Sequence, residues 1–273
     1  MIRIAFAVFT AVLFSPIFVW ADGPCKTFLP EGLRKVDTLE RVKQVSAILD
    51  ELAEKRETFL ASGDLVEMFP MLYYHMTRAQ FREALSRDQP LADDLLDIII
   101  AFYDAYSINR MLFDERGAKA VEKHWKTYYE RAVEQNRAKD LTTLDVFALL
   151  LYGVDAHLID LARTLRYSIP QAKLSTEDLR KGYYGLDPVF YEISKAAVAD
   201  IAAVKKIDER LKDLEQTFGL GARYAIQSRD RSWKNATGGG PLVARDPQPV
   251  VPGRKGSSSF FTLEETEACP KTS

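Results

Sequence analysis

The sequence predicts an all-α protein: a single bundle-like domain of about seven or eight helices over residues 22–237, followed by a flexible tail. Two observations carry this prediction. Apolar residues recur at spacings of three and four along most of the chain, as in helices with one buried face. Sustained alternation of apolar and polar residues is absent, as are hairpin signals, so the pattern does not indicate strands.

The first two predicted helices lie before residue 90. An amphipathic helix runs from Leu33 to about Leu60 and ends near Gly63, because apolar residues line one face and Lys, Arg and Glu the other. Asp64 and Glu67 have the spacing of a capping box that would start the second helix. Pro70 lies early in that helix, where proline marks either a kink or the true start.

The next three helices are marked by proline and by capping residues. Pro90 opens a third helix, since proline suits the first turn. A fourth is predicted over residues 118–137. The central helix follows, with Asp140 or Thr142 as its N-cap, and it stops at Pro170 because proline cannot continue a helix.

Three more helices complete the domain. A short one starts at Ser175–Asp178 and is broken by a Gly- and Tyr-rich stretch. A long one is predicted over residues 190–218, where apolar residues keep a spacing of three or four until Gly219. The last helix runs to about Ala236. From residue 238 onward glycine, proline and serine dominate, which is typical of a flexible tail rather than a domain.

The N-terminus has the features of a leader peptide. A short positively charged start precedes an uncharged run from Ile4 to Phe14, and Val19 and Ala21 place small residues at a cleavage site. We therefore expect residues 1–21 to be a signal peptide and the mature protein to be exported, either periplasmic or secreted. An uncleaved anchor is the alternative. After leader removal no stable membrane span is expected.

The composition of the chain limits the classes of partner that it can bind. The formal net charge is −2 with both signs interspersed, so no basic stripe indicates nucleic-acid binding. The two cysteines, Cys25 and Cys269, lie at opposite ends of the mature chain, and in an oxidising compartment they can form a disulfide. They are too far apart in sequence to be a metal signature.

The central helix holds the main candidate site, His157. It lies at the border of the apolar face, one turn after Gly153 and three residues before Asp160. A glycine inside a helix indicates close approach of either a neighbouring helix or a ligand. Asp160 is placed to orient His157 as a general base or metal ligand. The alternative is a border histidine that is simply hydrogen-bonded to Asp160.

Other candidate residues would complete a site around His157. Tyr152 and Asp155 lie on the same helix, Asp104 on the third, and Arg229 and Trp233 on the last, where they stack on each other or cap a pocket. Zinc, phosphate-loop and nucleophile-elbow motifs are absent, and a three-histidine zinc site would require all three histidines of the chain to converge. A mixed metal site of His157 with Asp104, Asp155 or Asp160 stays open, and no cofactor is identified.

The segment Gly153-Val154-Asp155-Ala156-His157-Leu158 resembles the Gly-x-Asn-Ala-His-Ile helix of an uncharacterised, mostly bacterial family of all-helical proteins, a domain of unknown function. Weaker similarities extend the match over roughly residues 65–236. This chain has Asp155 where the family has Asn. The resemblance implies a helical fold and a site at His157, Asp160, Arg229 and Trp233, but it implies no reaction.

Three functions remain open from the sequence. In the first, an interhelical pocket near His157 binds a small ligand, with Tyr152 and Arg229 making polar contacts. In the second, the protein is a hydrolase-type enzyme in which His157 works with Asp160. In the third, it is a structural or interaction protein without a pocket. The sequence favours the first, because it lacks the set of nucleophiles or ligands that most enzymes carry.

Overall fold

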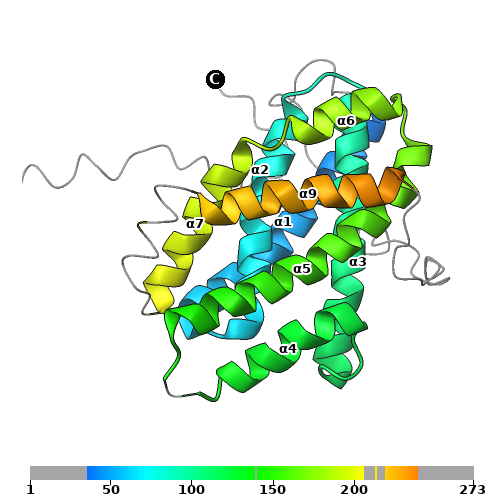
Figure 1. The fold of residues 1–273 in the computed structure, drawn as a ribbon. Coiled ribbons are helices and arrows are strands. Elements are labelled where there is room, and N and C mark those ends of the chain that lie inside the picture. Colours follow the sequence, from blue (N-terminus) through cyan, green and yellow to red (C-terminus); the bar gives the residue numbers. More distant parts are fainter. Residues whose placement is uncertain (1–35, 139, 206–212, 214–218, 239–273) are drawn as a thin grey trace, which may run out of the picture.

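A computed structural model describes residues 36–138, 140–205, 213 and 219–238 (Figure 1). In these residues the chain forms eight α-helices, two short 3-10 helices and no strand, which confirms the predicted all-α class. In chain order the elements are α1 (Val36–Ser62), η3 (Leu65–Glu67), α2 (Met68–Leu85), α3 (Leu91–Arg116), α4 (Lys123–Gln135), α5 (Thr143–Ser168), η4 (Ile169–Gln171), α6 (Thr176–Tyr184), α7 (Val189–Val204) and α9 (Leu220–Thr237).

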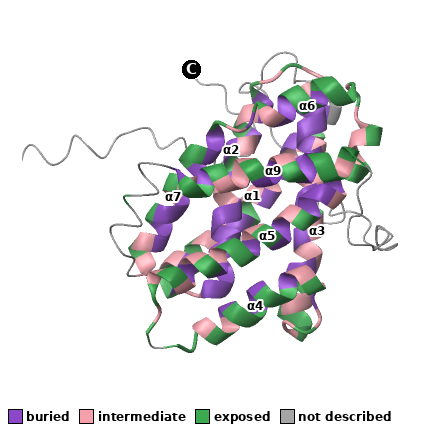
Figure 2. Cartoon of the chain, in the orientation of Figure 1, coloured by how far each residue is buried: buried purple, intermediate pink, exposed green. Residues whose placement is uncertain are grey.

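Two helices organise the packing. α2 packs against α1, α3 and α7, and α5 packs against α3, α4 and α9. In Figure 1, α4 and α9 flank α5 on its two sides. Figure 2 shows buried residues along the helices, and a central core rich in aromatic rings is formed mainly by α1, α2, α3, α4, α5 and α7. Two smaller cores lie at the α1–α2–α3 contact and between α3, α5, α6 and α9.

Several predicted helix ends are confirmed. Thr142 is the N-cap of α5 and forms a full capping box with Asp145, so the backbone N–H of each of these two residues is paired with the other's side chain. Ser175 caps α6 by accepting from the backbone N–H of Asp178. Gly63 ends α1 with φ of 67°, a conformation that favours glycine.

Other predicted ends are wrong. Asp64 does accept from the backbone N–H of Val66, but Glu67 does not complete a capping box, because its carboxylate is buried against Arg110 at 2.7 and 2.9 Å. The predicted long helix ends at Val204, where Lys205 is extended with φ of −115° and ψ of 140°. α4 starts at Lys123 rather than at residue 118.

Several expectations lie outside the described residues. These are the signal peptide of residues 1–21, both cysteines, Cys25 and Cys269, and the tail beyond residue 238. Among the helices that the structure does describe, none combines the length and the apolar character needed to cross a bilayer.

Candidate functional site

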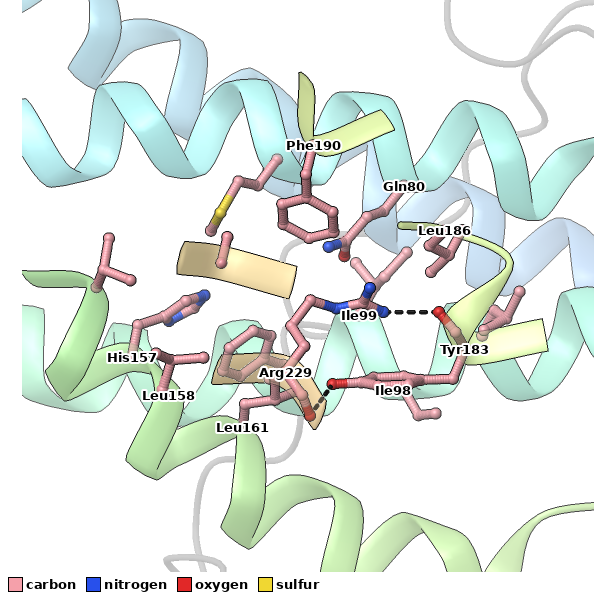
Figure 3. A pocket seen from close by; sticks show the side chains of 15 residues that line it. Gln80, Ile98, Ile99, His157, Leu158, Leu161, Tyr183, Leu186, Phe190 and Arg229 are labelled. Carbon is pink, nitrogen blue, oxygen red and sulfur yellow. Dashed lines mark hydrogen bonds between the residues drawn. The ribbon is translucent and has the colours of Figure 1, made fainter. Parts of the chain in front are cut away.

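A cavity of about 50 Å³ lies where α2, α3, α5, α6, α7 and α9 meet (Figure 3). On this measure one water needs about 10–15 Å³, so the cavity has room for only a few atoms of a ligand. Its wall is mostly apolar and includes Phe102 and Phe190. Its polar atoms come from Gln80, His157 and Arg229, together with Tyr183.

His157 forms the α5 side of this cavity. Its side chain is 3% exposed and its ring stacks on Phe102, with the centroids 3.7 Å apart and 24° between the planes. The rings of Tyr73 and His157 form a T-shaped pair with a centroid distance of 4.3 Å. Among the residues that the structure describes, neither Nδ1 nor Nε2 of His157 has a hydrogen-bond partner. Burial lowers the pKa of His157 well below its usual value, so the ring is neutral, with one N–H donor and one bare nitrogen acceptor.

Gly153 explains how this aromatic surrounding fits against α5. A Cβ added to Gly153 would lie 2.7 Å from Cδ2 of Phe69, a contact that real side chains do not make. The ring of Phe69 thus rests on the backbone of α5 and contacts the imidazole of His157 at a centroid distance of 5.0 Å. Of the two alternatives that the sequence left open, the neighbouring helix α2 is the one that approaches Gly153.

Asp160 does not orient His157, which corrects the predicted pair. Asp160 is 1% exposed and both of its carboxylate oxygens contact side chains of α4. Nε1 of Trp125 donates to Oδ2 at 2.7 Å, and Nε2 of His124 lies 2.8 Å from Oδ1. Arg163 is 3.7 Å away. The i, i+3 spacing makes a contact with His157 geometrically available, but two side chains of a facing helix have taken its place.

Arg229 forms the α9 side of the cavity and is 3% exposed. Its Nη2 donates to the carbonyl oxygen of Tyr183 at 2.7 Å, and Nη1 is paired with the carboxylate of Asp187. In return, the hydroxyl of Tyr183 donates to the carbonyl oxygen of Arg229 at 3.3 Å (Figure 3). Burial raises the pKa of Asp187, although the charge of Arg229 opposes this rise.

The predicted stacking of Arg229 on Trp233 is not what the structure has. The guanidinium lies 4.0 Å from the ring centroid of Tyr183 and 4.8 Å from that of Phe190. Trp233 packs instead on Tyr183, with centroids 5.0 Å apart. The arginine is drawn to Tyr183 because that residue offers a ring face and a carbonyl oxygen together.

The remaining predicted site residues lie away from the cavity. Tyr152 is 41% exposed on the outer face of α5, and Asp155, also exposed, accepts from the hydroxyl of Tyr224. Asp104 is exposed on α3. These exposed carboxylates do not converge on the buried His157, so the described residues do not form the mixed metal site that the sequence left open. Throughout the described ranges, no three His, Cys, Asp or Glu side chains are grouped so as to hold a metal.

Sequence reasoning missed three contributors: Gln80 in the cavity wall, Asp187 as the partner of Arg229, and His124 as the partner of Asp160. Gln80 follows Met76 by one turn on α2, so the sequence spacing could have placed it on the same helix face as that core residue. The other two pairings join residues 42 and 36 positions apart, which no local pattern reveals.

Comparisons with known proteins give no relative: no protein-family model, no curated protein and no solved structure matches this chain. The resemblance of the His157 helix to an uncharacterised bacterial family therefore stays an expectation.

Proposed function

We propose that this protein binds a small, uncharged, mostly apolar molecule that carries a hydrogen-bonding group, in the cavity between His157 and Arg229. The observation that carries the proposal is the unpartnered imidazole of His157. A buried polar group without a partner costs about 1–3 kcal/mol. A ligand that forms a hydrogen bond with Nδ1 or Nε2 recovers part of this cost, so binding of a polar atom next to His157 is favourable.

The charge of the site favours an uncharged ligand. Arg229 is the cationic group of the wall, and Asp187 already neutralises it. Burial keeps His157 neutral, so it offers no charge to a carboxylate or phosphate. Bringing a further charge into an apolar cavity without a partner is strongly unfavourable. The apolar rings and aliphatic side chains of the wall instead favour a compact apolar body.

The size of the cavity limits the ligand, or the buried part of it, to a few non-hydrogen atoms. Even the best tiny ligands gain at most about 1.5 kcal/mol per non-hydrogen atom. Five-membered rings are suitable probes, and we expect millimolar affinities for them, with a natural ligand gaining more from atoms outside the cavity.

The hydrolase alternative is less well supported. It requires Asp160 to orient His157, but Asp160 is engaged by His124 and Trp125. The cavity wall contains no Ser, Thr, Cys, Asp or Glu in the described part of the chain, so no nucleophile faces the imidazole.

We also propose export of the protein through the leader of residues 1–21, after which Cys25 and Cys269 pair as a disulfide. The supporting features are the charged start, the apolar run and the small residues before Asp22. N-terminal sequencing of the protein made in its native host tests this: a mature chain that begins at Asp22 is expected. An intact Met1 in the purified protein would contradict it.

Two probes of equal ring size test ligand binding. Pyrazole carries an adjacent N–H donor and nitrogen acceptor, whereas thiophene is an apolar five-membered ring. Binding of each to the folded protein is measured by ligand-detected NMR, with thermal shift as a second readout. We expect the wild type to prefer pyrazole over thiophene by about three- to tenfold, which corresponds to one hydrogen bond of about 0.5–1.5 kcal/mol.

Two variants assign that preference to His157. His157→Leu has a side chain of similar volume without ring nitrogens, and it should bind thiophene while losing the preference for pyrazole. Tyr152→Phe removes the hydroxyl of a residue outside the cavity and should bind as the wild type does. If neither probe binds the wild type, or if His157→Leu keeps the preference for pyrazole, the proposal is wrong.

A further inference from the structure

The outer face of α5 carries an unusual amount of exposed apolar surface. Eight large hydrophobic side chains of the described residues are exposed, and five of them lie on this one helix: Leu144 (71%), Leu151 (43%), Tyr152 (41%), Ile159 (41%) and Tyr167 (56%). Figure 2 shows α5 at the surface, with exposed residues along its length. Apolar surface gathered on one element indicates an interaction site, whereas single exposed apolar residues do not.

Four of these five apolar residues form two pairs that are symmetric about one midpoint, whereas the fifth, Leu151, has the buried Asp160 as its counterpart. Around the midpoint between Asp155 and Ala156, Leu144 and Tyr167 are equally distant, and so are Tyr152 and Ile159. If a second α5 lies antiparallel on the first, with its midpoint at the same place, then Leu144 meets Tyr167 of the other copy and Tyr152 meets Ile159. A two-fold symmetric contact requires this reciprocity, in which residue i meets j and j meets i.

One pair of opposite charges on α5 follows the same symmetry. Asp145 and Arg166 are also equally distant from the midpoint, so each carboxylate of one copy lies opposite a guanidinium of the other. Arg166 is exposed and donates to the carbonyl oxygen of Asn235 at 2.9 Å, which holds it at the edge of the face. Asp145 is fixed by the capping box with Thr142. An antiparallel pairing thus sets opposite charges together at both ends, and a parallel pairing does not.

From this register we propose that the outer face of α5 is a docking surface for a second copy of the same chain, packed antiparallel about a two-fold axis near Asp155. α5 has 26 residues and is therefore about 39 Å long. A helix face about 10 Å wide gives roughly 400 Å² per copy, or about 800 Å² in total, below the 1,200–2,000 Å² of stable complexes. The dimer is therefore weak and reversible, and it forms at high protein concentration.

Asp155 provides a signature that distinguishes this pairing from other occupants. It is exposed, it accepts from the hydroxyl of Tyr224, and it lies beside the axis, so the two copies bring two carboxylates close together. Like charges that face each other across a contact weaken it. Replacing Asp155 by the neutral Asn should therefore strengthen the dimer, an effect that an apolar surface bound by another partner has no reason to show.

Sedimentation velocity of the full mature chain, from about 1 µM to about 500 µM, tests the proposal. We expect concentration-dependent dimerisation of the wild type, at least tenfold weaker association of Tyr152→Glu, and about three- to tenfold tighter association of Asp155→Asn. Tyr191→Glu is the matched control, since Tyr191 is 40% exposed but lies on α7. It should dimerise as the wild type does.

Three outcomes would overturn the proposal. A wild type that stays monomeric over the whole range leaves the α5 face to a different occupant. Equal loss of association in Tyr191→Glu and Tyr152→Glu places the contact elsewhere. If Asp155→Asn associates no more tightly than the wild type, the two-fold axis does not lie near Asp155 and the proposed pairing is wrong. Circular dichroism of each variant establishes that it is folded.

Discussion

The imidazole ring of His157 lies on the phenyl ring of Phe102, with 3.7 Å between the ring centroids and 24° between the planes. The two residues come from α5 and α3, and together they form one wall of the interhelical cavity. This stacking places a titratable side chain inside an apolar core, and it leads to the first of four predictions.

The free energy of unfolding should decrease as the pH is lowered, because of His157. Burial depresses the pKa of His157 in the folded state below the usual 6.5. At pH values below 6.5 the imidazole is therefore protonated in the unfolded chain before it is protonated in the folded chain. Below pH 6.5 the free energy of unfolding should therefore decrease by up to about 1.4 kcal/mol per pH unit relative to His157→Leu. Urea denaturation at pH 7, 6 and 5 measures this difference. Parallel curves for wild type and variant would show that the imidazole is protonated without cost.

Asp160 should matter for stability and not for binding at His157. Asp160→Ala leaves the buried indole N–H of Trp125 without its acceptor, at about 1–3 kcal/mol, and removes the partner of Nε2 of the partly buried His124. We expect a loss of about 2–4 kcal/mol in the free energy of unfolding, against under 1 kcal/mol for the exposed Asp155→Ala. Pyrazole binding by the folded Asp160→Ala variant should be unchanged. If it were lost, Asp160 would act through His157 after all.

Gly153 should tolerate no side chain. Alanine normally favours a helix by about 0.5–1 kcal/mol over glycine, but its Cβ would lie 2.7 Å from Phe69. Overpacking of a core costs about 1–3 kcal/mol, so Gly153→Ala should be destabilising overall. Phe69→Leu makes room, and the double variant should lose less stability than the sum of the single changes. Strictly additive losses, measured by urea denaturation, would argue against this contact.

The ion pair between Glu67 and Arg110 should be costly to break from one side. Both side chains are buried, at 7% and 10% exposure, and Nη2 of Arg110 lies 2.7 Å from Oε1 of Glu67. Glu67→Leu leaves the guanidinium with Asp114, half exposed, as its acidic partner among the described residues, and we expect a loss of about 3 kcal/mol or more in unfolding free energy.

Two controls accompany this change. Adding Arg110→Met should restore most of the loss, because an apolar pair can replace a buried ion pair. Arg82→Ala breaks an exposed pair with Glu192, at 60% and 70% exposure, and should cost under about 1 kcal/mol. A double variant no more stable than Glu67→Leu would mean that the ion pair is needed for its charge.

Much of the fold followed from local rules, whereas the site did not. Thr142 and Ser175 start helices because a side-chain oxygen caps the backbone within three residues, and this is visible in the sequence. The end of α7 at Val204 was not predicted, because a lysine at position 205 is compatible with the polar face of a longer helix as well as with the extended backbone that the structure has there.

The partners of the site residues are set by tertiary packing. His157 was identified from its position on α5, but the carboxylate three residues away was expected to be its partner and instead serves α4. Likewise, Arg229 pairs with Asp187 and Tyr183 rather than with Trp233 on its own helix. In both cases a suitable partner lies within one turn of the same helix, but the contact is made by a side chain or backbone group from a different segment of the chain.

The two tryptophans of the described residues lie near different polar residues of the cavity wall, Trp125 near His157 and Trp233 near Tyr183. Trp125 lies 6.5 Å from His157 by ring centroids and shares the carboxylate of Asp160 with His124, while Trp233 packs on Tyr183 next to Arg229. Each indole is therefore a built-in fluorophore for one wall. Single-tryptophan variants would separate the two emission signals, so that the arrival of a small molecule can be timed at each wall without an added label.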